Sequence, residues 1–151
     1  LYLEQEELLL SIEKNIRNLN MMVTKARNIK IQLENKIKKM DNKKELSDLI
    51  DMAKKITFKI DEWEQNLIQP KQKTFQDVIN FHNKLNAEFI YLHEYVNSLD
   101  PQVTSGAMER FKDLDSKFRM SMKTFENDIL VSIEKYNIEY ERKNIPAIIL
   151  Q

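Results

Sequence analysis

Residues 9–40 decide the fold, and they read LLSIEKNIRNLNMMVTKARNIKIQLENKIKKM. Apolar side chains recur in this stretch at alternating intervals of three and four residues. They are Leu9, Ile12, Ile16, Leu19, Val23, Ala26, Leu33, Ile37 and Met40. Only Lys30 breaks the series. A heptad seam of this kind predicts a long amphipathic helix that packs against other helices, and we expect it to span Tyr2–Met40.

A second seam begins after a short turn. Asn42 followed by Glu45 resembles an N-cap with its partner three residues into the helix. The predicted helix runs from there to about Ile68 and ends before Pro70, because proline disfavours helical geometry in the residue that precedes it. Within this helix we expect Trp63 to be buried.

Two more helices follow. Thr74 and Asp77 resemble a capping pair for a third helix that ends near Leu99. Thr104 is the predicted N-cap of a long fourth helix, which covers about Ser105 to Arg142. The apolar residues 145–151 after it are predicted to be an extended tail.

The whole chain of 151 residues is predicted to be one all-α domain. It contains one glycine and three prolines, so turns are few and helices are long. Because short connections favour antiparallel neighbours, we expect an antiparallel up-down-up-down four-helix bundle. The long first and last helices then extend beyond the inner two as a two-helix stalk. In this register Trp63 lies beside Leu19 and Met22.

Composition excludes several classes of function. The 24 basic and 24 acidic residues balance, whereas a nucleic-acid binder needs a basic excess to displace counterions. The absence of cysteine excludes disulfides and Cys-based zinc sites. No apolar run approaches the roughly 20 residues that a membrane-spanning helix needs. We therefore expect no nucleic-acid partner and no membrane span.

The sequence offers no catalytic pattern. The two histidines, His82 and His93, would stand roughly 16 Å apart on one straight helix, too far to share a metal ion. No Gly-x-Ser-x-Gly elbow is present. We expect no catalytic, metal-binding or cofactor-binding residue and no cofactor, and we expect that the chain is not an enzyme.

Five lysines gather at the predicted tip of the first hairpin: Lys36, Lys38, Lys39, Lys43 and Lys44. They could contact an anionic partner such as lipid headgroups or polysaccharide. The alternative is that they only complement the negative C-terminal end of the first helix, as Glu4, Glu6 and Glu7 complement its N-terminal end.

The stalk is the predicted partner-binding surface, because two helices alone cannot cover all of the apolar rows found there. The predicted residues are Leu8, Leu9, Ile12, Ile129, Ile133, Tyr136, Tyr140, Ile145, Ile148 and Ile149. The alternative is that the apolar tail folds back and covers the stalk.

Three segments are distinctive beyond their periodicity. They read WEQNLIQPKQKTFQDVINFHNKLN (63–86), DPQVTSGA (100–107) and NIPAIIL (144–150). From Trp63 onward the chain resembles the helical C-terminal region of large bacterial sortilin-like β-propeller proteins. These are exported proteins of the Bacteroidetes type with BNR-like repeats, often labelled glycosyl hydrolases.

This resemblance implies that the chain is the C-terminal part of a larger propeller protein in the periplasm or at the cell surface. The propeller repeats themselves are not among the 151 residues, so no catalytic residue is carried over. We expect a non-catalytic protein-interaction or architectural module. Its partner would be the β-propeller domain of the same protein or another subunit. The alternative is a free-standing, coiled-coil-like homo-oligomerisation domain.

Overall fold

The computed structural model describes residues 2–68, 84–98 and 102–143, and every element in these ranges is a helix. The elements are α1 (Tyr2–Met40), the 3₁₀ helix η1 (Lys44–Leu46), α2 (Ser47–Gln65), α4 (Leu85–Ser98), α5 (Ser105–Thr124), the π-helix η2 (Phe125–Leu130) and α6 (Val131–Arg142). The prediction of an all-α fold is confirmed for the described residues. The predicted first helix has the observed bounds, and α5, η2 and α6 together cover the predicted fourth helix.

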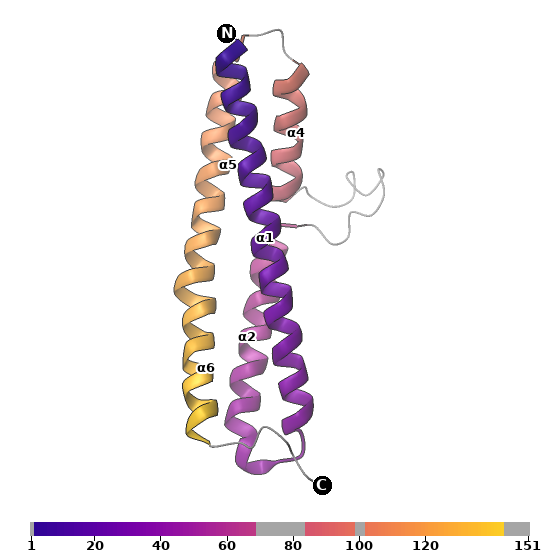
Figure 1. The fold of residues 1–151 in the computed structure, drawn as a ribbon, viewed down its shortest axis with the longest axis vertical. Helices are drawn as coiled ribbons and strands as arrows, with labels where there is room; N and C mark the ends of the chain where they lie inside the picture. The colour runs from indigo at the N-terminus through magenta and orange to yellow at the C-terminus, as the bar shows by residue number, and fades with distance from the viewer. Residues whose placement is uncertain (1, 69–83, 99–101, 144–151) are drawn as a thin grey trace.

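The described helices form three long rods (Figure 1). One rod is α1, and a second is the continuous run of α5, η2 and α6, which lies along the whole of α1. The third rod has two pieces. The α2 piece lies along the C-terminal half of α1, where Lys30 Nζ is 2.6 Å from Asp61 Oδ1. The α4 piece lies along the N-terminal half, where His93 Nε2 is 2.9 Å from Glu13 Oε1.

The predicted up-down-up-down order is not the order of the described helices. Instead of turning back beside α2, α4 continues in the direction of α2. The backbone N–H of Asn86 donates to the carbonyl oxygen of Leu67 at 2.9 Å, which joins the two pieces end to end. At the other end of α4, Gln5 Nε2 donates to the carbonyl oxygen of Val96 at 2.8 Å. The predicted third helix was expected to leave the N-terminal end of the first helix uncovered. As α4, it covers that end instead.

The turn after α1 also differs from its prediction. Asn42 is not an N-cap; it has a φ of 67°, in the left-handed region that asparagine tolerates better than most residues. The N-cap position of η1 is Lys43, whose side chain makes no capping hydrogen bond. The turn and η1 together use more residues than a tight hairpin, so α2 begins only at Ser47.

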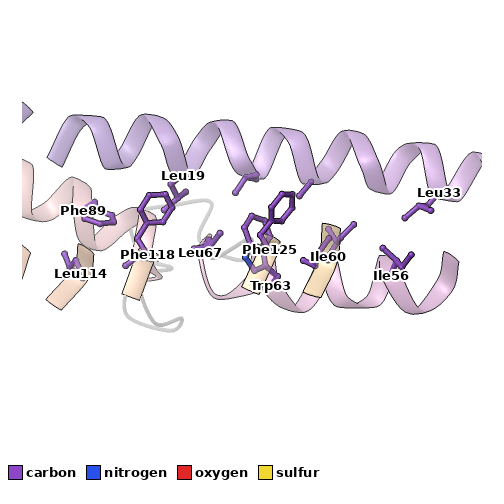
Figure 2. Close-up of a cluster of buried hydrophobic side chains, with 14 of the residues drawn as sticks. Leu19, Leu33, Ile56, Ile60, Trp63, Leu67, Phe89, Leu114, Phe118 and Phe125 are labelled. Carbon is purple, nitrogen blue, oxygen red and sulfur yellow. The ribbon is translucent and has the colours of Figure 1, made fainter. Parts of the chain in front are cut away.

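The longer turn moves Trp63 to a different level of the bundle. Trp63 is buried as predicted, but Figure 2 shows it beside Phe125, whereas Leu19 lies by Phe118. The ring centroids of Trp63 and Phe125 are 5.0 Å apart, and the indole Nε1–H donates to the carbonyl oxygen of Ser121 at 2.9 Å. The predicted pairing of Trp63 with Leu19 is therefore wrong.

One apolar core runs the length of the three rods. Among the described residues, every fully buried side chain is hydrophobic, and these side chains form a single cluster. At the α4 end, Phe89 and Phe118 make an edge-to-face contact with centroids 6.2 Å apart. The predicted cap of the last rod is confirmed, since Thr104 Oγ1 accepts a hydrogen bond from the Ala107 backbone N–H at 3.1 Å. The predicted Thr74–Asp77 cap and the extended tail lie outside the described residues.

Candidate functional site

The structure places most of the predicted partner-binding residues in or against the core. Leu8, Ile12, Ile129 and Tyr136 are buried. A further three, Leu9, Ile133 and Tyr140, are partly buried and pack against the same core. The expectation that these side chains are exposed is wrong, because a third helix covers each end of the rod pair. α4 packs against α1 and α5 beside Leu8 and Ile12, and α2 packs against η2 and α6 beside Ile129 and Tyr136. Ile145, Ile148 and Ile149 lie outside the described residues.

The two halves of the predicted site are also far apart. The last rod runs parallel to α1, so its C-terminal end lies beside the C-terminal end of α1, where Lys36 Nζ donates to Tyr140 Oη at 3.2 Å (Figure 1). Leu8 and Ile12 lie at the opposite end, among α4 and α5. The fold therefore does not assemble these residues into one surface.

The apolar surface that α4 exposes was not foreseen from the sequence. Ile90 is 42% exposed, Tyr91 46% and Tyr95 49%, while Leu85, Phe89, Leu92 and Val96 on the other side of the helix are buried. The signal was present in the sequence, since LNAEFIYLHEYVNS has apolar side chains on all sides and no lysine or arginine. A helix of this kind is normally covered on more than one face.

Tyr91 and Tyr95 border a groove of about 340 Å³ between α4 and the start of α5. Gly106, the one glycine of the chain, forms part of its wall, and a Cβ built there would meet nothing within 4 Å. Arg110 closes one end of the groove and is held by two carboxylates, Glu88 at 2.8 Å and Asp113 at 2.9 Å. The groove is thus lined by two tyrosines and by a guanidinium paired with two carboxylates.

A larger hollow of about 1090 Å³ extends over α1 and reaches α4. Its lining residues are Glu13, Ile16, Arg17, Asn20, Met21, Thr24, Lys25, Asn28, Ile29, Gln32, Ile90, His93 and Glu94. The lining mixes apolar side chains, such as Ile16, Met21 and Ile29, with charged ones, such as Arg17 and Lys25.

The lysine-rich hairpin tip is only partly available for an anion. The ammonium of Lys36 lies 4.8 Å from the centroid of the Tyr140 ring as well as donating to its hydroxyl. From the end of α6, Lys143 reaches the carbonyl oxygen of Glu45 at 3.5 Å. Beside this contact the hydroxyl of Tyr136 is buried without a hydrogen-bond partner among the described residues, and burial raises the pKa of Tyr136 to about 12.

Residues 2–68, 84–98 and 102–143 contain no group of three or more His, Asp or Glu side chains that could hold a metal ion. No helix in these ranges is both long and apolar enough to cross a membrane. His93 Nε2 lies within hydrogen-bond distance of Glu13 Oε1, and His82 lies outside the described residues.

No protein-family model, curated protein or solved structure matches this chain.

Proposed function

We propose that this chain is a non-catalytic protein-interaction and architectural module of an exported, sortilin-like propeller protein. The observation that carries the proposal is the outer face of α4. Ile90, Tyr91 and Tyr95 stand within six positions on a helix whose opposite side is already buried in the core. Tyr91 and Tyr95 share the groove beside α5, and Ile90 lies on the side of α4 toward α1. Exposed apolar side chains gathered on one helix mark a candidate interaction site, and tyrosine is enriched in such sites.

The partner that we propose for this face is the β-propeller domain of the same protein, or another subunit. α4 belongs to the part of the chain from Trp63 onward, where the resemblance to propeller-associated regions is found. Its only acidic residues are Glu88 and Glu94, and Arg110 holds Glu88 in place. A docked surface would then meet aromatic rings with few charges to desolvate, which keeps the cost of burial low.

The architectural part of the proposal rests on the length and continuity of the bundle. α1 has 39 residues, which makes it about 58 Å long. The run of α5, η2 and α6 extends without a break from Ser105 to Arg142 and shares one core with α1. A rod of this kind holds its two ends at a set separation, as a spacer between domains requires.

Footprinting tests the proposal. The isolated chain and the natural full-length protein are compared by tyrosine modification followed by mass spectrometry. We expect Tyr91 and Tyr95 to be protected in the full-length protein. Tyr140, which is partly exposed and lies beside Lys36 at the opposite end of α1 from α4, is the internal reference. Equal modification of Tyr91 and Tyr95 in both samples would contradict the proposal. Protease treatment of intact cells tests the proposed location at the cell envelope.

The alternative function is self-association, and a specific observation favours it. Charges along α1 are segregated, with acidic residues at its N-terminal end and basic residues in its middle. This charge pattern lies on α1 and is independent of the exposed face of α4.

A further inference from the structure

The charge pattern of α1 is too long to be an effect of the helix dipole. Residues 2–13 contain four acidic residues and no basic one, namely Glu4, Glu6, Glu7 and Glu13. Residues 14–33 contain five basic residues and no acidic one, namely Lys14, Arg17, Lys25, Arg27 and Lys30. The dipole accounts for acidic residues in the first turn, but its effect fades within that turn and does not explain a basic block in mid-helix.

Part of the basic block is used inside the molecule. Arg27 pairs with Glu64 of α2, and Lys30 pairs with Asp61. The remaining three, Lys14, Arg17 and Lys25, have no carboxylate within ion-pair distance among the described residues. Three carboxylates of α1 likewise have no cationic nitrogen within ion-pair distance among the described residues, namely Glu4, Glu6 and Glu7. The ammonium of Lys25 lies 5.9 Å from the centroid of the Phe125 ring, a contact that leaves its charge unneutralised. Among the described residues, charges of both signs on α1 therefore lack an oppositely charged partner.

Exposed apolar side chains lie on the same outer face of α1. Leu3 is 66% exposed, Leu10 56% and Met21 63%. Leu3 and Leu10 are seven residues apart, and Leu10 and Met21 are eleven apart, so all three share one side of the helix. We call these three residues, with the unpaired charges between and beside them, the outer stripe. Leu10 has Glu6 one turn before it, and Met21 has Arg17 and Lys25 one turn away on either side.

We propose that the outer stripe docks against the outer stripe of a second copy of this chain, with the two α1 helices antiparallel and the two-fold axis near residues 15 and 16. In this register Leu10 packs on Met21 of the second copy. Glu6 lies opposite Lys25 of the second copy, and the two-fold axis repeats each of these contacts. The acidic N-terminal end of each α1 then faces the basic middle of the other α1. A parallel pair of α1 helices would instead place like charges together.

One approach in this register is unfavourable. Lys14 comes close to Arg17 of the second copy, and Glu13, the neighbour of Lys14, offsets part of this repulsion. The helices overlap over residues 3–28, a length of about 38 Å. The interface is narrow and partly electrostatic, so we expect a reversible dimer whose dissociation constant rises with ionic strength.

The inference rests on the proposed role as an interaction module but uses α1 rather than α4. A failure of the dimer therefore leaves the protection of Tyr91 and Tyr95 as a separate result.

Charge exchange tests the interface. One variant carries Glu6→Lys, and a second carries Lys25→Glu. The mass in solution is followed by sedimentation over a range of concentrations. We expect each variant alone to dimerise at least about tenfold more weakly, because like charges now meet. An equimolar mixture of the two variants should recover the dimer, since opposite charges face each other again.

The matched control reverses one exposed lysine of α2, Lys55→Glu, with the same change in net charge as the second variant. The control should dimerise like the parent chain, and circular dichroism checks that all variants stay helical. A parent chain that stays monomeric, or a mixture that does not recover the dimer, would overturn the proposal.

The chain has no cysteine, so single cysteines report the orientation without interference. Under mild oxidation a mixture of the Leu10→Cys and Met21→Cys variants should form the crosslinked heterodimer. Each variant alone should crosslink much less. Efficient crosslinking of each variant with itself would indicate parallel helices and contradict the antiparallel arrangement.

Discussion

The two halves of the bundle have one core but different surfaces. In the C-terminal half of α1, the covering helix α2 exposes one large apolar residue, Phe58, and its carboxylates Asp61 and Glu64 pair with cations of α1. In the N-terminal half, α4 exposes three large apolar residues, and α1 keeps unpaired charges on its outer face. Charge pairing thus joins α2 to α1 in one half, and the surface that we propose for a partner lies in the other half.

The largest effect is expected from Trp63→Ala in the α2 half. The substitution removes a buried ring that packs on Phe125, and it leaves the carbonyl oxygen of Ser121 without its indole donor. We expect a loss of about 3–5 kcal/mol in the free energy of unfolding, measured with urea. Phe58→Ala is the control, with an expected loss within about 0.5 kcal/mol because its ring is exposed. A loss below about 1 kcal/mol for Trp63→Ala would contradict the observed packing.

Phe89→Ala tests whether the two halves unfold together. Phe89 is buried against Phe118, so we expect a loss of about 3 kcal/mol or more. Because the core is continuous, tryptophan fluorescence and circular dichroism should report a single transition at the same urea concentration. If the fluorescence of Trp63 survives a first loss of helix, α4 unfolds on its own and the halves are separate units.

Thr104→Ala removes the N-cap of α5 at the α4 end. Its hydroxyl accepts from the Ala107 N–H, so the expected loss is about 1 kcal/mol. Thr124→Ala is the matched control, because its exposed hydroxyl only donates to the Met120 carbonyl oxygen within the helix. Equal stability of the two variants in thermal unfolding would mean that the cap contributes nothing.

The smallest effect is expected from Lys30→Met, which breaks a pairing with α2. The hydrogen bond to Asp61 raises the pKa of Lys30 above its usual 10.5. A raised lysine pKa stabilises the fold below the unfolded-state value, and this contribution is lost as the pH rises through the folded-state value. Both side chains are partly exposed, so the loss at pH 7 should be under about 1 kcal/mol and should shrink with salt. A difference from the parent chain that persists in 1 M salt would indicate lost packing rather than lost charge.

Local features of the fold were readable from the sequence. The seam of residues 9–40 predicted the bounds of α1, and the Thr104 cap predicted where the last rod begins. Both depend on neighbours within a few positions of the chain. The charge segregation on α1 was readable in the same way, since residues 14–33 contain no acidic residue.

The sequence by itself determined the bounds of α1, the start of α5 and the apolar side of the described helices, because periodicity and capping are properties of a short stretch of chain. Only the tertiary structure decided which helix each apolar side meets. A seam on α4 could have faced either half of α1, and the hydrogen bond between Asn86 and Leu67 aligns α4 with α2 so that it covers the N-terminal half. That placement buried Leu8 and Ile12, and it left Ile90, Tyr91 and Tyr95 at the surface. The direction of a helix after a connection depends on the packing of the whole bundle, which no local pattern contains.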